Sequence, residues 1–211
     1  AVGVSCGGPL DSQSGVILSP PNLPGWDNIP IVATLEKELG MKAGIQNDAN
    51  ACALAEWKFG AGRGTRNMVF MTFGTGLGAG LILNGALYAG TNDNAGELGP
   101  IRLADCGPVG YGKSGSFEGF ASGGGIAQLA QMYVKEQLQM GHHVTWCPAD
   151  KISTITAADV AQAAATGDAL ACRIYDTSAT YLGRGLSIVI DLLNPEVIVI
   201  GSIYTRNEKI M

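Results

Sequence analysis

The hydrophobic pattern of the chain predicts a mixture of strands and helices. Short continuous apolar runs predict strands at residues 1–5, 41–45, 67–73, 81–83 and 197–200. Apolar positions that recur every three or four residues predict helices just after residue 48 and at 31–39, 127–139, 157–165 and 168–193. A further short helix is expected to begin after Ser202 and to run towards Met211.

One junction between a strand and a helix carries a polar pair. The apolar run 41–45 passes through Asn47 and Asp48 into a helical pattern that contains Leu54 and Lys58. A carboxylate at such a junction lies where ligands of open α/β sheets bind. Asn and Asp are also among the preferred N-caps of helices. This stretch alone therefore leaves two interpretations open, a catalytic carboxylate and a structural cap.

Glycine-rich turns mark further candidate ligand positions. The turn Gly74-Thr75-Gly76 between two apolar strands exposes backbone N–H groups and a hydroxyl, the groups that cradle phosphate oxygens. It matches neither the Walker pattern nor the dinucleotide fingerprint. Gly7-Gly8-Pro9 allows a ligand close to the backbone or forms a plain surface loop. Gly201 follows the strand 197–200, at another position where ligands bind.

Several isolated charged residues and histidines in the predicted loops can be explained as solvent-exposed surface residues without a functional role. Glu97 and Glu118 stand among glycines, and on local grounds each reads as a solvated loop charge. His142 and His143 are adjacent and have no partner at ligand spacing, so a surface loop is expected there.

Composition narrows the class of protein. An apolar content of 46% with 15% charged residues is typical of a globular chain. The net charge of −5 and the pI near 4.9 argue against nucleic acid as a partner. No apolar run is long enough to span a bilayer, and the five scattered cysteines predict reduced thiols, so a cytoplasmic protein is expected. Because Ala1 already stands in a strand pattern, the chain is expected to be a piece of a longer one.

Six motifs in order resemble the signatures of the ROK family, which comprises bacterial sugar kinases and sugar-responsive repressors. They are Gly7-Gly8-Pro9, Pro21-Asn22-Leu23-Pro24-Gly25-Trp26, Asn47-Asp48-Ala49-Asn50, Gly74-Thr75-Gly76-Leu77-Gly78, Ala95-Gly96-Glu97-Leu98-Gly99 and Asn194-Pro195-Glu196-Val197-Ile198-Val199-Ile200-Gly201. The resemblance implies an α/β protein with the two-lobe actin-like ATPase fold, of the ribonuclease H-like and hexokinase type, incomplete at the N-terminus. Residues 1–46 would be the remainder of the small lobe, and 47–211 the large lobe with the sugar and nucleotide sites.

The resemblance also implies roles for individual residues. Asp48 would be the general base, so of the two interpretations of that junction the resemblance favours the catalytic carboxylate. The substrate-binding residues would be Gly8, Asn22, Asn47, Glu97 and Glu118. The ATP-binding residues would be Gly74, Thr75, Gly76 and Gly201, with Mg²⁺ across the phosphates.

Two departures from the family pattern stand out. Most members hold a structural zinc ion with one His and three Cys, and the matching positions here are Pro100, Val109, Tyr111 and Ser116. Because thiolate and imidazole donors are missing, no structural zinc and no metal ligand are predicted. The family's Asp-x-Gly-Gly-Thr phosphate loop has no counterpart in the chain, so catalysis by this chain alone is expected to fail.

The sequence therefore predicts an ATP-dependent sugar kinase that transfers the γ-phosphate to a hydroxyl of a hexose or amino-hexose. The alternatives are a sugar-sensing transcriptional regulator of the same family and a catalytically degenerate sugar-binding protein. The expected partners are a sugar and ATP, with no nucleic acid or membrane bound by this chain. The resemblance also implies that the chain can form a homodimer.

Overall fold

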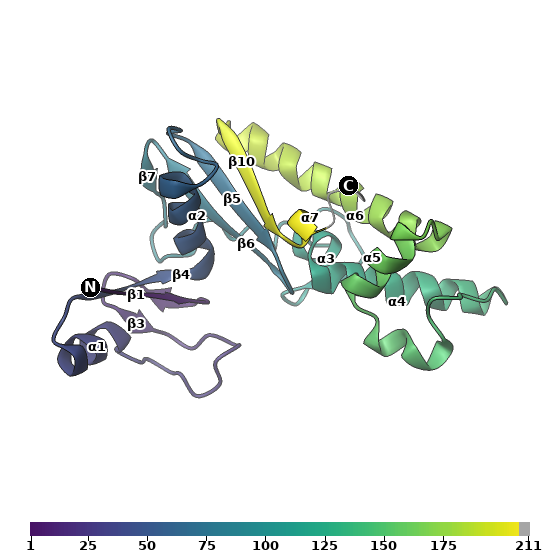
Figure 1. Cartoon of the computed structure of the whole chain (residues 1–211), viewed down its shortest axis with the longest axis horizontal. Helices are drawn as coiled ribbons and strands as arrows, with labels where there is room; N and C mark the ends of the chain where they lie inside the picture. Colours follow the sequence, from purple (N-terminus) through teal and green to yellow (C-terminus); the bar gives the residue numbers. More distant parts are fainter. Residues whose placement is uncertain (207–211) are drawn as a thin grey trace. The chain divides into compact units, whose positions relative to one another are not determined.

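The computed structural model describes residues 1–206 and shows a mixed α/β chain (Figure 1). Its residues group into two units, each described here by itself. The first unit comprises 1–71, 79–97 and 195–199, and the second comprises 72–78, 98–194 and the chain from Ile200 on. The predicted lobe boundary after residue 46 stays a prediction.

The first unit begins with a parallel strand pair. Strand β1 (Val2–Cys6) runs beside β4 (Ala43–Asn47), with Cys6 opposite Asn47 at the carboxyl ends. Helix α1 (Ile31–Leu39) and the hairpin of β2 (Leu10–Asp11) and β3 (Val16–Ile17) lie close to this pair. Leu10, Ile17 and Ile45 form the buried core that joins these elements.

A four-stranded sheet, in the order β10-β5-β6-β7, follows in the chain (Figure 1). Its strands are β5 (Met68–Phe73), β6 (Leu77–Leu83), β7 (Ala86–Leu87) and β10 (Val197–Ser202). Helix α2 (Asp48–Phe59) packs Ala53 among Met68, Phe70 and Ile82 of the sheet. The predicted Asn84-Gly85 hairpin turn joins β6 to β7, with positive φ at both residues.

The strand predicted at 81–83 begins earlier than the sequence suggested, at Leu77, so that prediction was wrong at its start. Gly78 and Gly80 belong to β6 and not to the glycine-rich turn. A Cβ atom on Gly80 would lie 2.6 Å from the Cβ of Ala53 and 2.8 Å from the carbonyl oxygen of Ala49. Glycine is needed at this point because α2 passes directly over the strand.

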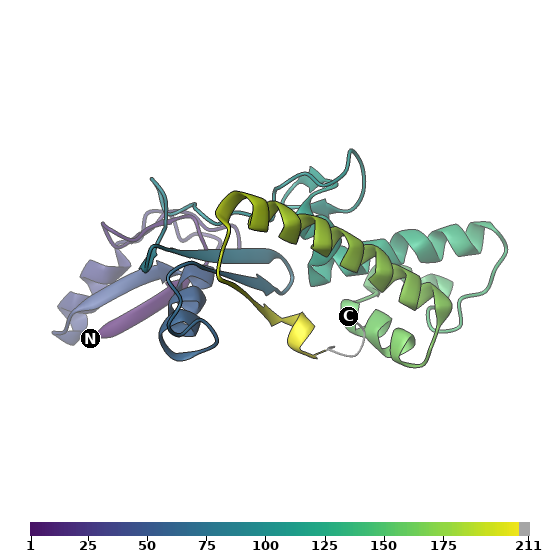
Figure 2. The same cartoon turned by 90° about the horizontal axis from the view of Figure 1, so that it is seen from above.

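The second unit is mainly helical. Its elements are β8 (Val109–Gly110), β9 (Lys113–Ser114), α3 (Phe117–Ala121), α4 (Gly123–Gln139), the 3₁₀ helix η1 (Ala149–Thr154), α5 (Ala157–Ala165), α6 (Ala169–Leu193) and α7 (Ile203–Arg206). Helices α4 and α6 lie side by side (Figure 2), and buried side chains such as Ile126, Val134 and Ile174 form the core between the helices.

Most of the predicted elements are confirmed, with shifts at their ends. The predicted helices at 31–39 and 157–165 have the observed bounds, and the helix that begins after Ser202 is α7. Its predicted continuation over 207–211 lies outside the described residues. Strand β4 spans 43–47 instead of 41–45, because its pairing with β1 begins at Ala43, opposite Val2, and ends at Asn47, opposite Cys6.

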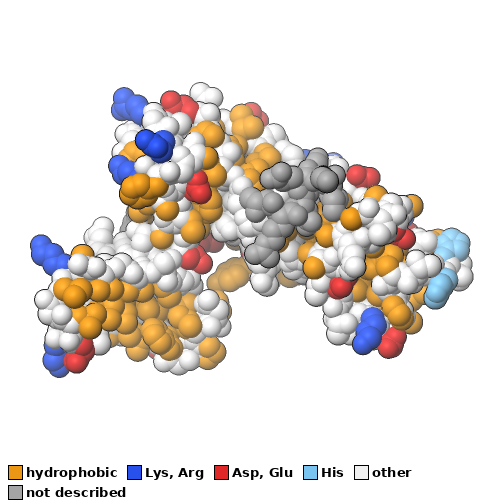
Figure 3. Space-filling view, in the orientation of Figure 1, with side chains coloured by type: hydrophobic (Ala, Val, Ile, Leu, Met, Phe, Trp, Pro, Cys, Tyr) orange, Lys and Arg blue, Asp and Glu red, His pale blue; other side chains and the backbone are white. Residues whose placement is uncertain are grey.

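The surface loop predicted at His142 and His143 is confirmed. His142 and His143 are exposed, and Figure 3 shows the histidine side chains together on the surface. None of the helices within residues 1–206 combines the length and the apolar character that a bilayer span requires.

Candidate active site

The β4–α2 junction places Asn47 and Asp48 in different roles. The side-chain Oδ1 of Asn47 accepts hydrogen bonds from the backbone N–H of Ala49 at 3.0 Å and of Asn50 at 3.2 Å, which caps α2. The Oδ1 of Asp48 accepts from Ala49 at 2.8 Å, and the Asp48 residue is exposed. Asn47 alone can therefore cap the helix, and the Asp48 carboxylate is open to solvent.

The negative charge of Asp48 affects the pKa of two nearby cysteine thiols. Burial, and then the charge of Asp48, raise the pKa of the Cys6 thiol at the end of β1. Burial raises the pKa of Cys52, one helical turn after Asp48, and the charges of Asp48 and Glu56 add to that effect. The Asp48 carboxylate thus lies near both the carboxyl end of β1 and Cys52 in its own helix.

The parallel pairing of β1 and β4 brings other predicted residues to the same edge. Because Cys6 lies opposite Asn47, the Gly7-Gly8 turn passes beside the Asn47 side chain. A Cβ atom on Gly8 would lie 3.6 Å from Asn47 Nδ2, and one on Gly7 would lie 3.3 Å from Asn22 Nδ2. The predicted residues Gly8, Asn22, Asn47 and Asp48 are therefore neighbours in the first unit.

The loop after β7 carries Glu97. Gly96, which precedes it, has a φ of +88°, and a Cβ atom there would lie 2.5 Å from the carbonyl oxygen of Ala79. Asp93 in the same loop accepts hydrogen bonds from the N–H and the hydroxyl of Ser12, at 2.8 and 2.9 Å. These contacts hold the loop against β6 and the β2–β3 hairpin, and Glu97 is exposed beyond them.

The Gly74–Gly76 turn, in the second unit, meets the N-terminus of α4. The N–H of Gly123 donates to the carbonyl of Gly74 at 2.8 Å, and the N–H of Gly124 donates to the carbonyl of Thr75 at 3.1 Å. Within residues 1–206 we find no protein acceptor for the N–H groups of Thr75 and Gly76. This turn can therefore offer two backbone donors to an anion.

Glu118 lies beside this turn, which the sequence did not predict. It stands in the first turn of α3, and its Oε2 accepts from the N–H of Leu77 at 2.8 Å. A Cβ atom on Gly76 would lie 2.8 Å from the same oxygen, and one on Gly99 would lie 3.2 Å from it. Glycines at both places thus leave room for the carboxylate.

The end of β10 also reaches the turn. Gly201 and Ser202 are the last residues of β10, and a Cβ atom on Gly74 would lie 4.0 Å from Ser202 Oγ. Tyr204 anchors this region, because its hydroxyl donates to the carbonyl of Ala121 at 2.7 Å. Burial raises the pKa of Tyr204 to about 12, so the hydroxyl stays a donor at neutral pH.

The predicted residues thus form two groups. Gly8, Asn22, Asn47, Asp48 and Glu97 belong to the first unit. Gly74, Thr75, Gly76, Glu118 and Gly201 belong to the second.

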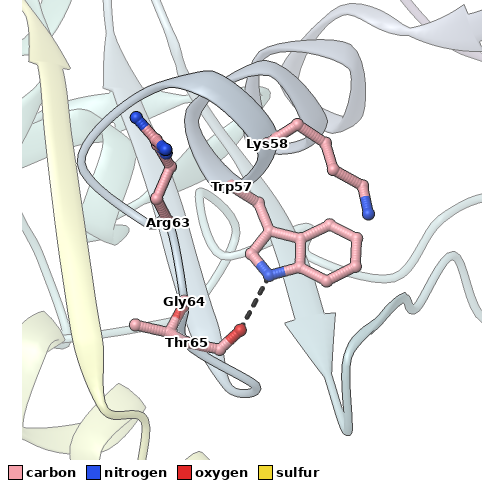
Figure 4. A pocket seen from close by; sticks show the side chains of 5 residues that line it. All are labelled: Trp57, Lys58, Arg63, Gly64 and Thr65. Atoms are coloured by element: carbon pink, nitrogen blue, oxygen red, sulfur yellow. Dashed lines mark hydrogen bonds between the residues drawn. The ribbon is translucent and has the colours of Figure 1, made fainter.

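A cavity of about 280 Å³ lies apart from the predicted residues, at the C-terminal end of α2 (Figure 4). The indole N–H of Trp57 donates to the carbonyl of Thr65 at 2.8 Å, and Lys58 Nζ lies 3.7 Å from the centre of the Trp57 ring. Figure 4 shows Lys58 and Arg63 extending on opposite sides of the indole. Because the two cations do not point to a common position, we assign the cavity no ligand. Its lining contacts fasten the loop after α2 to the end of that helix.

The fold and the motifs agree with comparisons to known proteins. The family model described as "ROK family" matches residues 1–211. The chain belongs to the ROK family.

A glucokinase of Halalkalibacterium halodurans is 38% identical over 95% of this chain and 61% of its own length. The DNA-binding transcriptional repressor Mlc of Escherichia coli is 29% identical over all of this chain and 50% of its own length. The crystal structure of a ROK family glucokinase from Streptomyces griseus, in complex with glucose and AMPPNP, matches with a TM-score of 0.78 and 30% identity, over 95% of this chain and 64% of that one. The ROK chain therefore spans about three fifths of the glucokinases it matches, and the predicted actin-like ATPase fold class is confirmed.

The four positions that match the family's zinc ligands do not fit a zinc ion. Pro100, Val109 and Tyr111 carry no zinc-binding donor, and Ser116 is fully buried with its Oγ accepting from the N–H of Gly119 at 3.1 Å. Across the described part of the chain, no group of three or more His, Cys, Asp or Glu side chains is arranged to hold a metal ion.

Sequence reasoning missed residues that support the site. Asn50 is 1% exposed, donates to Gln46 Oε1 at 3.3 Å, and its Oδ1 has no partner among the described residues. The sequence signal that could have identified Asn50 is a polar residue on the helix face that the buried Ala49 and Ala53 occupy. Gln128 contacts the loop that precedes α3, and nothing in its local sequence distinguishes it from the other glutamines of α4.

Proposed function

We propose that the whole protein is an ATP-dependent sugar kinase and that Asp48 is its general base. The supporting observation is the division of roles at the β4–α2 junction. Asn47 supplies a cap for α2, while the carboxylate of Asp48 stays exposed. A carboxylate held at a fixed point but open to solvent can accept the proton of a sugar hydroxyl.

The neighbours of Asp48 suit a sugar. The side-chain amides of Asn22 and Asn47 offer both donors and acceptors to hydroxyl groups, and the Gly7-Gly8 backbone lies against both amides. By the resemblance to the family, Glu97 and, in the second unit, Glu118 would also accept hydrogen bonds from sugar hydroxyls. The proposed ligand is therefore a hexose or amino-hexose, bound through its hydroxyl pattern.

The Gly74–Gly76 turn suits the phosphates of ATP. The N–H groups of Thr75 and Gly76 would donate to phosphate oxygens, with Gly201 near the adenosine. Phosphoryl transfer needs positioning and charge stabilisation more than covalent help. Mg²⁺, bound with ATP, would neutralise part of the phosphate charge.

The relatives support the choice of substrate to test first. The Halalkalibacterium halodurans relative is named a glucokinase, and the Streptomyces griseus structure contains glucose and AMPPNP. Glucose therefore heads the panel of hexoses.

The test is coupled ADP release by the whole protein with Mg-ATP and a panel of hexoses. Asp48→Asn keeps the shape of the side chain but removes the base, and general-base catalysis is worth about 100-fold or more in kcat. We expect that loss in Asp48→Asn, with little change in the sugar KM. Asp191→Asn, an exposed aspartate in the last turn of α6, is the matched control and should retain full turnover.

A sugar-sensing regulator is the second candidate, because the Mlc repressor matches the whole of this chain. The same experiment separates the two. Sugar-dependent turnover in wild type, lost in Asp48→Asn, supports the kinase. A thermal shift on sugar addition without turnover of any hexose would overturn the kinase proposal in favour of a sensor or a degenerate sugar-binding protein.

A further inference from the structure

The segment that leads into α3 has little regular structure of its own. Strands β8 and β9 are two residues long, and Tyr111 and Gly112 between them both have positive φ. A hairpin this short is not stable alone. Contacts from other elements must therefore hold it in place.

Gln128 of α4 holds β8 with both ends of its side-chain amide. Its Nε2 donates to the carbonyl oxygen of Val109 at 2.8 Å, and its Oε1 accepts from the N–H of the same residue at 2.9 Å. The side chain thus pairs with Val109 as a neighbouring strand would. Helix α4 is a firm support, because the flanking residues Ile126, Leu129 and Ala130 are buried.

Several other hydrogen bonds hold this segment, including two made by the side chains of Lys113 and Ser116. Lys113 Nζ donates to the carbonyl of Pro100 at 2.9 Å. Ser116 Oγ accepts from the N–H of Gly119, which ties the end of the segment to α3. We call the two hydrogen bonds between Gln128 and Val109 the Gln128 clamp. The clamp and the bonds of Lys113 and Ser116 involve Pro100, Val109 and Ser116, which are three of the four positions that match the zinc ligands of other family members.

The clamp is connected to Glu118 by direct packing. A Cβ atom on Gly110 would lie 2.7 Å from the Cβ of Glu118 and 2.6 Å from the N–H nitrogen of Gly119. Strand β8 therefore lies against the first turn of α3 with no space between them. A displacement of Val109 and Gly110 would move Glu118, whose Oε2 in turn holds the N–H of Leu77.

We propose that the hydrogen-bond clamp of Gln128 on Val109, with the ties at Pro100 and Ser116, replaces a metal ion as the support of this segment and positions Glu118 for sugar. Gln128 is thus a positioning residue. Its effect on sugar binding rests on the proposed function, whereas its effect on the order of the segment does not.

The experiment compares three variants of the whole protein. Gln128→Ala removes the clamp, and Gln128→Glu keeps the acceptor for the Val109 N–H but loses the donor to its carbonyl. Gln131→Ala is the matched control, because Gln131 is a half-buried glutamine of the same helix, with no side-chain hydrogen bond recorded among the described residues. The first readout is amide hydrogen exchange over residues 107–119, with and without a strong zinc chelator, alongside the zinc content of the protein. The second is the KM for sugar and kcat, measured after Mg²⁺ is restored.

We expect exchange over 107–119 to be about 10-fold faster in Gln128→Ala, intermediate in Gln128→Glu and unchanged in Gln131→Ala, since one to two net hydrogen bonds are lost. Chelator should have no effect on wild type. The sugar KM should rise severalfold in Gln128→Ala while kcat changes less than about twofold, and Gln128→Glu should recover part of that loss.

Stoichiometric zinc in the protein, or loss of protection on chelation, would overturn the proposal. Equal exchange in Gln128→Ala and Gln131→Ala would overturn it as well, and so would a fall in kcat with unchanged KM. If no sugar is phosphorylated at all, the kinase proposal fails, and the exchange readout still decides whether the clamp holds the segment.

Discussion

The Asn47-Asp48 junction and the Gly74–Gly76 turn are held in different ways. At the junction the side-chain hydrogen bonds are local, since Asn47 caps the helix that begins one residue later and Asp48 accepts from its immediate neighbour. Around the Gly74–Gly76 turn, the contacts come from distant parts of the chain. Glu118 lies 41 positions after its partner Leu77, and Gly123 binds the carbonyl of Gly74.

This difference determines how each group should respond to substitution. A cap acts on one helix end, and its loss removes one or two hydrogen bonds. A turn held by several distant backbone groups depends on the packing of all of them, and a single added methyl group can displace it. We therefore expect the turn around Gly74 to be the more easily damaged of the two.

The largest effect is expected from Gly123→Ala. A Cβ atom there would lie 2.8 Å from the carbonyl oxygen of Gly74, which accepts from the N–H of the same residue. The clash must displace the turn, and overpacking of this kind costs about 1–3 kcal/mol. We expect the KM for ATP to rise about 10-fold or more while the sugar KM changes far less, measured by coupled ADP release.

Gly183→Ala is the control for that substitution. Gly183 lies inside α6 with nothing within 4 Å of its Cβ position, so alanine there should raise stability slightly. Equal behaviour of the two alanine variants would show that the turn tolerates a shift, and the contrast between the two groups would then be wrong.

A smaller effect is expected from Asn47→Ala. Loss of the N-cap of α2 should lower the free energy of unfolding by about 1 kcal/mol. For a domain of 150–250 residues this corresponds to a fall in Tm of roughly 2–4 °C. Asn47→Asp keeps an acceptor for the N–H groups of Ala49 and Asn50 and should melt near the wild-type temperature.

Thermal unfolding of the three proteins tests this assignment. If Asn47→Ala melts like wild type, Asp48 is the effective cap, and its carboxylate is not available as proposed. That outcome would weaken the kinase mechanism as well as the comparison.

The smallest effect is expected from Glu196→Gln, which tests the side-chain hydrogen bonds between the residue just before β10 and the chain just before β5. Glu196 Oε2 accepts from the backbone N–H of Arg66 and, at 2.7 Å, of Asn67. These bonds, that of Asn67 first, lower the pKa of the exposed Glu196 carboxyl from its ordinary value of 4.5. The folded state therefore binds this proton more weakly than the unfolded state does.

The sign of the pH dependence follows from that difference. The contribution of the carboxylate is present above pH 4.5 and is lost as the pH falls through the lower pKa of the folded state. The Tm of wild type should exceed that of Glu196→Gln at pH 7, and the difference should shrink below pH 4.5. A difference that stays constant from pH 7 to pH 3 would mean that the charge of Glu196 has no part in it.

Much of the fold was predictable because its signals are periodic. Apolar spacing located α1, α5 and α6, and Asn84-Gly85 marked the hairpin between β6 and β7. The short elements β2, β3, β8, β9, α3 and η1 were missed, since two to six residues are too few to show a period. The start of β6 was misplaced because glycine usually marks a turn, whereas Gly80 is needed for close packing under α2.

The sequence by itself determined the strand–helix alternation, the Asn47-Asp48 junction and the glycine turn, because each depends on residues that are neighbours along the chain. Only the tertiary structure decided which of Asn47 and Asp48 caps the helix, that Glu118 lies beside the Gly74–Gly76 turn, and that Gln128 clamps Val109. The last two choices depend on which distant backbone groups the packing of buried side chains brings within hydrogen-bond reach. The choice of cap depends on the backbone angles at which β4 passes into α2, since Asn47 and not Asp48 keeps an extended backbone there. The local residue pattern specifies neither.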